Sequence, residues 1–365
     1  MVHDRQRLKE LQALPLERKI MISQARLIEW YKHFNGEVYV SFSGGKDSTV
    51  LADVFARICQ QFGWKLYLVF VNTGLEYPEI QKFVKEYAEW LRQQYGIEVE
   101  LEILRPKMRF DEVIKQYGYP LISKQVSKTV SAARRLDSKF GVVCRERLNG
   151  TELQKSGKKS LYNCSKYKPL LDVDFEVSNF CCDIMKKTPS HKYSKQTGKM
   201  AITATMADES MLREKVWIKQ GCNAFDAKNP ISNPMSFWTE QDVLQYIKRY
   251  NLPIASVYGE IIYETDPEQM RFEEFGIDES KSEKLTTTGC KRTGCIFCAF
   301  GCHLEKEPSR FQMLKETHPR QYSYCIGGGE FNENGIWQPS KEGLDMGYVF
   351  DELNKIYGEN FIKYK

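Results

Sequence analysis

The stretch SFSGGKDSTV, residues 41–50, decides the fold of this chain. It overlaps the end of a run of β-forming residues, EVYVSF at 37–42. It leads into apolar residues that recur at helical spacing, namely Val50, Leu51, Val54, Phe55 and Ile58. The order is therefore strand, glycine turn, helix. That order is typical of parallel α/β sheets, whose ligands bind at the carboxyl ends of the strands.

The residues of the turn suit a magnesium-bound polyphosphate. Glycines let backbone N–H groups converge on an anion, and the start of a helix adds a positive partial charge. Lys46 can neutralise one phosphate, and Ser48 can donate a hydrogen bond to another. Asp47 would repel phosphate unless a cation lies between them, which makes it a candidate Mg²⁺ ligand. The alternative is a plain turn with charged surface residues, but the flanking strand and helix favour the phosphate site.

The same alternation continues along the chain. Strands are expected at 65–71, 99–104 and 201–205, with helices from 78 onward and at 210–220. Alternating strands and helices predict a Rossmann-like α/β fold, in which a parallel sheet carries helices on both faces.

Three regions are expected in sequence order. Residues 1–36 form an N-terminal helical segment, and residues 37–232 form the nucleotide-binding domain. That domain carries a basic insertion at about 107–198, where the strand–helix alternation breaks. Residues 233–365 form a helical and cysteine-rich C-terminal region, whose part after 260 looks loop-rich.

The composition is that of a globular protein with a core: 42% of the 365 residues are hydrophobic and 28% are charged. No apolar run approaches the roughly 20 residues that span a membrane, and the charged first twenty residues lack a secretory signal. We therefore expect a cytoplasmic protein with no membrane partner. Eleven cysteines in such a compartment stay reduced, so their clustering indicates metal or redox chemistry.

Four motifs together resemble a known family. SGGKDS after a strand resembles the phosphate loop, or PP-loop, of the adenine nucleotide alpha hydrolase-like ATP-pyrophosphatase superfamily. Within that superfamily the chain resembles the phosphoadenosine phosphosulfate (PAPS) reductase family. FVNTGLEYPE (70–79) is similar to the second-strand motif of that family, and TATMADESMLREKVW (203–217) to its substrate loop. CCDIMKKTP (181–189) with TGCIFC (293–298) resembles the iron–sulfur signature of the adenylylsulfate reductases.

The resemblance implies an enzyme that acts on an adenine nucleotide. Members of the superfamily split ATP between its α and β phosphates, adenylate a substrate and release pyrophosphate. The substrate is expected to be ATP with Mg²⁺, or else PAPS or adenylylsulfate. The residues implied in nucleotide binding are Ser43, Gly44, Gly45, Lys46, Asp47, Ser48, Asn72, Thr73, Gly74, Ser210 and Arg213. Those implied in catalysis are Lys46, Asp47 and Arg213.

The resemblance also implies a [4Fe–4S] cluster with four thiolate ligands, Cys181, Cys182, Cys295 and Cys298. Adjacent cysteines diverge too far for one metal ion, but a cluster about 3 Å across offers each of them a separate iron. A competing set within thirteen residues could hold zinc or a cluster on its own: Cys290, Cys295, Cys298 and Cys302. The resemblance favours the first set, because only that set uses the adjacent pair.

Two features separate adenylation from sulfonucleotide reduction. Reductases of the family usually have an altered phosphate loop, whereas SGGKDS is complete here and favours ATP. They also attack sulfur with a C-terminal cysteine, and the only candidate here, Cys325, lacks the matching surroundings. We therefore expect ATP-dependent adenylation coupled to sulfur transfer. The alternatives are a PAPS or adenylylsulfate reductase that releases sulfite with thioredoxin, and a nucleotide-binding Fe–S protein without turnover.

A basic segment supplies a candidate surface for an anionic partner. Between Lys124 and Lys168 the chain has twelve Lys or Arg residues and three Asp or Glu residues. Relatives that adenylate and transfer sulfur act on tRNA or DNA, so the resemblance implies that this segment could hold a nucleic acid. A sulfur donor protein is a further expected partner. The alternative is a solvated, partly disordered loop.

Overall fold

The computed structural model describes residues 3–154, 156–264 and 284–365. The chain divides into two compact units, each assembled from segments that are far apart in the sequence. The first unit comprises Met1–Asn72, Glu76–Leu104 and Ser190–Thr293. The second comprises Thr73–Leu75, Arg105–Pro189 and Gly294–Lys365. Each unit thus has several boundaries in the sequence, whereas the three regions expected above follow one another along it.

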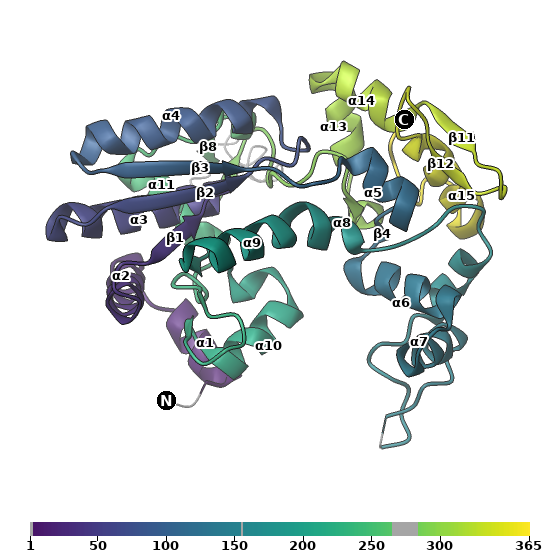
Figure 1. Ribbon diagram of the computed structural model, residues 1–365, viewed down its shortest axis with the longest axis horizontal. Coiled ribbons are helices and arrows are strands. Elements are labelled where there is room, and N and C mark those ends of the chain that lie inside the picture. The colour runs from purple at the N-terminus through teal and green to yellow at the C-terminus, as the bar shows by residue number, and fades with distance from the viewer. Residues whose placement is uncertain (1–2, 155, 265–283) are drawn as a thin grey trace, which may run out of the picture. The chain divides into compact units, whose positions relative to one another are not determined.

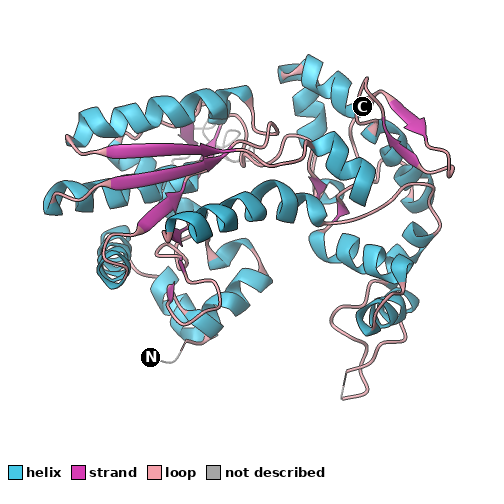
Figure 2. Cartoon of the chain, in the orientation of Figure 1, coloured by secondary structure: helices cyan, strands magenta, loops and turns pink. Residues whose placement is uncertain are grey.

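The first unit is built on a six-stranded sheet with the strand order β3-β2-β1-β5-β7-β6. Neighbouring strands pair parallel, except β7 and β6, which pair antiparallel. Figures 1 and 2 show β1, β2 and β3 side by side. The strands are β1 Val38–Ser41, β2 Leu66–Val71, β3 Val99–Leu104, β5 Met200–Ile202, β6 Asn223–Ala224 and β7 Ile231–Ser232. The α/β fold with a mostly parallel sheet is therefore confirmed.

Helices and a short β-ribbon complete the first unit. The helices are α1 Arg5–Gln12, α2 Leu16–His33, α3 Lys46–Phe62, α4 Pro78–Tyr95, α10 Met211–Gln220, α11 Glu240–Tyr250, and the short turns η3 Ala207–Glu209 and η4 Ser256–Tyr258. The ribbon pairs β8 Ile261–Tyr263 with β9 Leu285–Thr287. The core lies between the sheet and these helices, and its fully buried side chains include Leu27, Val40, Val50, Leu51, Leu68 and Val84. Removing such apolar surface from water is the main stabilising term.

A buried carboxylate joins three helices of the first unit. Asp53 of α3 is fully buried and accepts hydrogen bonds from Tyr95 of α4 at 2.5 Å and Tyr246 of α11 at 2.7 Å. Arg57, one turn further along α3, donates to the same carboxylate at 2.8 Å. A buried charge is tolerated only when it is paired and hydrogen-bonded, and both conditions are met here. The cluster therefore fixes α3 against α4 and α11.

The second unit is mainly helical. Its helices are α5 Phe110–Tyr117, α6 Lys124–Arg135, α7 Lys139–Asn149, η1 Ser165–Leu171, α8 Phe180–Cys182, the π-helical turn η2 Asp183–Lys187, η5 Cys302–Leu304, α13 Arg310–Thr317, α14 Pro319–Ile326 and α15 Met346–Tyr357. Helix α9, Thr188–Thr197, passes from the second unit into the first. The strand pairs are β4 Leu121–Ile122 with β10 Ala299–Phe300, and β11 Gly329–Phe331 with β12 Trp337–Pro339. The region after 260 was expected to be loop-rich, but its described residues, 261–264 and 284–365, include three helices of eight or more residues.

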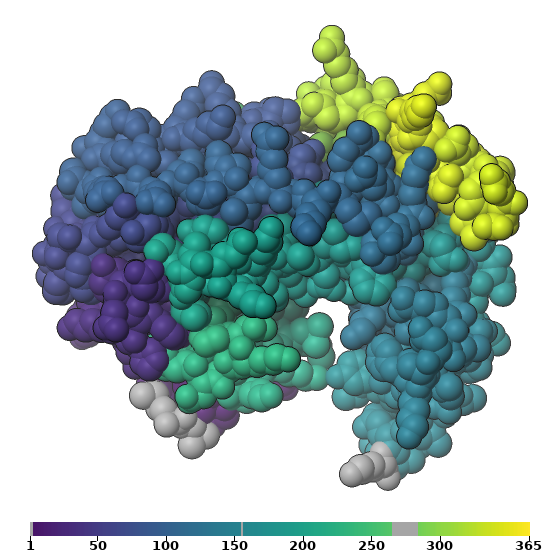
Figure 3. All heavy atoms as spheres, viewed as in Figure 1, coloured from purple at the N-terminus to yellow at the C-terminus, as the bar shows by residue number. Residues whose placement is uncertain are grey.

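The basic segment 124–168 is largely helical, which corrects the alternative of a disordered loop. It contains α6 and α7, and its atoms form the blue-green group at the lower right of Figure 3. Arg134 is used structurally, because it donates to the backbone carbonyls of Leu170 and Val173, both at 2.8 Å, and of Phe175 at 2.7 Å. Most of the lysines of the segment are exposed. Within the described ranges, no helix combines the length and apolarity needed to cross a bilayer.

Candidate nucleotide site and cysteine cluster

The PP-loop, Ser43–Ser48, connects β1 to α3 and is held in shape by its own hydroxyl groups. Ser48 Oγ donates to the carbonyl of Gly45 at 2.9 Å and accepts from the backbone N–H of Ser43 at 3.2 Å. The hydroxyls of Ser43 and Ser48 are also 3.0 Å apart. Ser48 is buried, and its hydrogen bonds fix the conformation of the loop without a ligand.

Gly44 needs to be glycine for two reasons. Its φ of +71° lies in the left-handed region, which favours glycine. A Cβ there would also lie 2.9 Å from the Cγ2 atoms of both Ile80 and Val84 on α4. The loop therefore passes directly over α4, where a side chain of any size would collide.

Lys46 is buried at the first position of α3 and has three oxygen neighbours. Its Nζ lies 3.0 Å from Glu240 Oε1 and 3.5 Å from Asp47 Oδ1, and it donates to the carbonyl of Lys291 at 3.3 Å. Burial lowers the pKa of Lys46, but the carboxylates of Asp47 and Glu240 outweigh burial, so that its pKa is raised. Lys46 therefore keeps its positive charge at the loop.

The Asp47 carboxylate has one oxygen that a cation could bind. The Oδ1 atom is buried and has no hydrogen-bond partner among the described residues, although the side chain as a whole is 32% exposed. Burial raises the pKa of Asp47, and the charge of Lys46 partly offsets that rise. A buried oxygen without a donor is costly unless something else satisfies it. A divalent cation beside the phosphates would do so.

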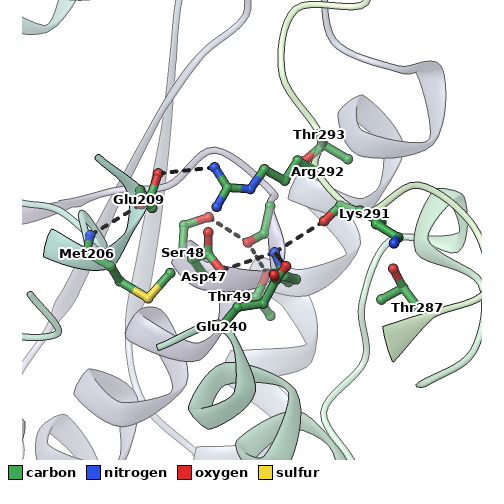
Figure 4. A network of polar contacts seen from close by, with 12 residues as sticks. Asp47, Ser48, Thr49, Met206, Glu209, Glu240, Thr287, Lys291, Arg292 and Thr293 are labelled. Carbon is green, nitrogen blue, oxygen red and sulfur yellow. Dashed lines mark hydrogen bonds and ion pairs between the residues drawn. The ribbon is translucent and has the colours of Figure 1, made fainter. Parts of the chain in front are cut away.

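A segment more than 200 positions away in the sequence lies against the PP-loop. The backbone N–H of Lys46 donates to Tyr258 Oη at 3.1 Å, and Tyr258 Oη lies 2.6 Å from Thr293 Oγ1. Residues 287–293, here called the strap, thereby bring the carbonyl of Lys291 and the side chain of Arg292 to the loop (Figure 4). The sequence reading missed Tyr258, Arg292 and Glu240, although the adjacent cations of GCKRTGC were a usable signal.

Ser210 and Arg213, the two residues implied by the substrate-loop motif, lie at the start of helix α10. Ser210 is the N-cap of that helix and accepts from the backbone N–H of Arg213 at 3.3 Å. The Arg213 guanidinium forms an ion pair with Glu209, which also lies 3.7 Å from Arg292. Glu209 is itself oriented by the backbone N–H of Met206, at 3.3 Å. One carboxylate thus lies beside two arginines, one on α10 and one on the strap.

The second-strand motif is divided between the two units. Asn72 extends the pairing of β2 with β3, because its N–H donates to the carbonyl of Leu104 at 2.9 Å. Thr73 and Gly74 belong to the second unit, where Thr73 Oγ1 accepts from the N–H of Leu75 at 3.2 Å. The roles of Asn72, Thr73 and Gly74 in nucleotide binding stay predictions.

Four cysteines line one small cavity within the second unit, together with Leu75, Phe110, Pro120, Met185 and Lys186: these are Cys181, Cys182, Cys295 and Cys298. The adjacent pair lies where α8 runs into the π-helical turn, and its two sulfurs are 4.0 Å apart. The C-x-x-C pair forms a tight turn, closed by the N–H of Cys298 on the carbonyl of Cys295 at 3.0 Å. The pairing of β10 with β4 follows directly and holds that turn in place.

The thiols of the cavity differ in the direction of their pKa shifts. The hydrogen bond from Cys181, with the ammonium groups of Lys124 and Lys186, lowers the pKa of Cys182 to about 6. The same hydrogen bond, together with burial, raises the pKa of Cys181 well above that of an ordinary thiol, and burial raises the pKa of Cys298. In the described ranges, no three His, Cys, Asp or Glu side chains gather closely enough to hold a single ion. A [4Fe–4S] cluster sets a different requirement, because its four thiolates bind four separate irons around one shared volume.

The competing cysteine set is spread over both units. Cys290 belongs to the first unit, and its thiol donates to the carbonyl of Arg292 at 2.8 Å. Cys302 belongs to the second unit, is buried, and donates to the carbonyl of Ala299 at 3.0 Å. Burial raises the pKa of Cys302 to about 12, just as burial raises the pKa of Cys298, which belongs to both sets. Both sulfurs are thus engaged with backbone carbonyls.

Comparison with known proteins identifies the family. Residues 37–300 match the phosphoadenosine phosphosulfate reductase domain, so the chain belongs to that family. A stretch of 105 residues is 30% identical to an uncharacterized protein of Methanocaldococcus jannaschii, covering 29% of this chain and 23% of that protein. The chain therefore spans under a quarter of that relative's length. An NH3-dependent NAD synthetase of Campylobacter jejuni, solved with nitrate, aligns with a TM-score of 0.31 and 11% identity over 72% of this chain and 85% of that one.

Proposed function

We propose that the chain uses ATP to adenylate a substrate, releases pyrophosphate, and couples this step to sulfur transfer. One observation carries the proposal: the complete PP-loop presents a charged Lys46 and a buried Asp47 oxygen that lies 3.5 Å from its ammonium group and forms no hydrogen bond with any described residue. A cation-bound triphosphate satisfies both groups, since its phosphates need Lys46 and its Mg²⁺ needs a carboxylate. A nucleotide without β and γ phosphates makes less use of this pair.

The chemistry is a substitution at the α-phosphorus. An oxygen of the acceptor attacks and forms a new P–O bond, while the bond to the β-phosphate oxygen breaks and pyrophosphate leaves with its electron pair. Lys46 and the loop N–H groups stabilise the charge that builds on the leaving group. A sulfur nucleophile then displaces AMP from the activated acceptor. Arg213 is proposed to contact the nucleotide during these steps, after exchanging its ion pair with Glu209.

The second unit is proposed to hold a [4Fe–4S] cluster on the four cysteines that line one cavity. The fit rests on the set of donors, since four thiols face a shared volume and two nearby lysines offset their negative charge. When bound, such a cluster would supply electrons or a binding site for sulfur. The ligands would be Cys181, Cys182, Cys295 and Cys298.

The acceptor is proposed to be a nucleic acid, tRNA or DNA, bound by segment 124–168. Cations of this segment, the exposed Lys128 and the partly buried Arg147 that is ion-paired with Glu152, lie beside aromatic rings, which is the combination that binds nucleic acid strands. Lys128 Nζ is 5.0 Å from the ring centre of Phe140, and the guanidinium carbon of Arg147 is 4.9 Å from that of Tyr162. The sulfur is proposed to arrive from a donor protein.

Sulfonucleotide reduction is the second candidate, favoured by the family to which the chain belongs. It would release sulfite from PAPS or adenylylsulfate with thioredoxin as reductant, and it needs a nucleophilic thiol. Cys325 does not suit that task, because it is fully buried and its sulfur packs 3.6 Å from that of Met346. Burial raises the pKa of Cys325 well above that of an ordinary thiol. The geometry thus supports adenylation better.

The test is product analysis on anaerobically purified protein. One sample receives Mg·ATP with and without RNA or DNA, and another receives PAPS or adenylylsulfate with reduced thioredoxin. We expect AMP and pyrophosphate from the first sample, dependent on the nucleic acid and lost in Asp47→Asn. Sulfite from the second sample would instead establish the reductase. Nucleotide binding without any product would indicate a protein that binds nucleotide without turnover.

A further inference from the structure

The strap places a cation at the PP-loop that neither the sequence motifs nor the family match assigns. Arg292 lies between Lys291, whose carbonyl accepts from Lys46 Nζ at 3.3 Å, and Thr293, whose hydroxyl lies 2.6 Å from Tyr258 Oη. Tyr258 Oη in turn accepts from the N–H of Lys46 at 3.1 Å. The backbone on both sides of Arg292 is therefore fixed to the first residue of α3.

The strap is also fixed to its own surroundings in the first unit. The N–H groups of Gly289 and Cys290 donate to the carbonyls of Tyr258 and Val257, both at 2.9 Å. A Cβ on Gly289 would lie 2.4 Å from the Val257 carbonyl oxygen, so the approach of these two backbones requires glycine. The side chain of Arg292 is less constrained than this backbone. It is 60% exposed and reaches Glu209 at 3.7 Å, a distance longer than a direct hydrogen bond.

Figure 4 shows the Arg292 guanidinium reaching toward Glu209 on the side of the loop where Asp47 and Ser48 lie. Its charge is close enough to act on the Asp47 carboxyl group. Glu209 lies beside both Arg292 and Arg213, so one carboxylate keeps two guanidinium groups near the loop. Guanidinium groups bind phosphate oxygens through paired, charge-assisted hydrogen bonds. An arriving polyphosphate can therefore replace Glu209 as their partner.

We infer that Arg292 binds the β and γ phosphates of the nucleotide held by residues 43–48, and that Glu209 is the anionic partner that these phosphates displace. This inference rests on the proposed function, because it assumes a triphosphate at the loop. Arg292 of the strap thereby distinguishes the phosphate chain of ATP from the single phosphate of AMP. Lys46 acts from the loop and Arg292 from the strap.

The experiment measures binding of inorganic pyrophosphate, Mg·ATP and AMP to the full chain by calorimetry. Arg292→Gln should weaken pyrophosphate and Mg·ATP binding by about tenfold or more, the effect of one lost charge-assisted contact, and leave AMP binding within about twofold. Arg292→Lys should recover part of the loss. The matched control is Arg249→Gln, which removes an exposed arginine that is ion-paired with Glu17 at the last turn of α11. It should bind all three ligands as the wild type does.

Glu209→Gln gives the opposite expectation. It removes a competing carboxylate from two arginines, so pyrophosphate should bind several-fold more tightly, by roughly the strength of an exposed ion pair. Equal pyrophosphate affinity in the wild type and Arg292→Gln would overturn the inference and leave adenylation standing, as would an equal loss of AMP binding. A wild type that binds pyrophosphate but forms no AMP would overturn adenylation alone. A wild type that binds neither pyrophosphate nor ATP would overturn both.

Discussion

Glu240 Oε1 lies 3.0 Å from Nζ of Lys46, so the cation of the phosphate loop already has an anionic partner when no nucleotide is bound. Glu240 is the first residue of α11, and its own side chain is 42% exposed. A partly exposed carboxylate can rotate into water at little cost, whereas the buried ammonium group cannot follow it. Phosphate binding therefore exchanges one anion for another at Lys46.

Replacing this competitor should strengthen anion binding. In Glu240→Gln, pyrophosphate no longer has to displace a carboxylate from Lys46, so its affinity should rise by about three- to tenfold. Calorimetric titration without Mg²⁺ isolates the effect on the ammonium group. Glu17→Gln, which removes an exposed carboxylate of α2, should change nothing. Weaker pyrophosphate binding in Glu240→Gln would mean that Glu240 assists the phosphates instead of competing with them.

The ionisation of Asp47 should cost stability at neutral pH. Burial raises the pKa of Asp47 above the ordinary carboxyl value of about 3.9, so the folded chain binds this proton more tightly than the unfolded chain does. Stability therefore falls as the pH rises from the unfolded pKa through the folded pKa, and the deficit persists above that window. Asp47→Asn should raise the Tm by about 1–3 °C at pH 7.

The same gain should shrink below about pH 4, where the wild-type carboxyl group is protonated in both states. Scanning calorimetry across this pH range measures it. Asp226→Asn, at an exposed position, serves as the control and should leave the Tm unchanged. A Tm gain for Asp47→Asn that is independent of pH would contradict the linkage argument.

Two glycines, Gly44 in the phosphate loop and Gly63 at the C-terminal end of α3, allow backbone strain to be distinguished from steric collision. Gly63→Ala, at φ +67° with nothing within 4 Å of the new Cβ, should cost about 1 kcal/mol of unfolding free energy through strain alone. Gly44→Ala adds a collision with Ile80 and Val84, so it should cost about 2–4 kcal/mol. Urea unfolding of both variants compares them directly. Equal losses would show that α4 yields to the added methyl group.

Iron content distinguishes the two cysteine sets. After anaerobic reconstitution, Cys181→Ser and Cys182→Ser should each lower bound iron from about four to below one per chain. Cys302→Ser should keep its iron, because a hydroxyl can still donate to the carbonyl of Ala299. Iron and sulfide analysis, with the visible absorption spectrum, reads out the result. Iron that is lost in Cys302→Ser but retained in Cys181→Ser would favour the competing set, which contains Cys302 and not Cys181.

The strand–turn–helix unit could be predicted from the sequence because its determinants are local. The glycine turn, the β-forming run before it and the helical periodicity after it all lie within 37–58. The partners of Lys46 could not be predicted in the same way, since Tyr258 and Lys291 are 212 and 245 positions away. No local pattern records contacts of that span. The position of Arg292 beside the loop therefore follows from the tertiary fold and not from the local sequence.

The two-unit division was hidden for a related reason. Thr73–Leu75 interrupts the first unit between Asn72 and Glu76, and the N–H of Ile296 donates to the carbonyl of Leu75 at 2.8 Å in the second. A segment of three residues is too short for its composition to show that it belongs to the other unit. The cysteine pairs, in contrast, were noticed from their unusual density, although only the structure shows that both line one cavity.

The Asp53 cluster bears on how the protein responds to its ligand. Hydroxyls from α4 and α11 converge on one carboxylate of α3, so these three helices cannot shift independently without leaving a buried charge unpaired. The loop at the start of α3 is thus ordered during folding and not during binding. Its ligand should meet a rigid cradle, with the conformational entropy of that segment already removed. Differences in affinity among nucleotides should accordingly appear in how fast they leave more than in how fast they arrive.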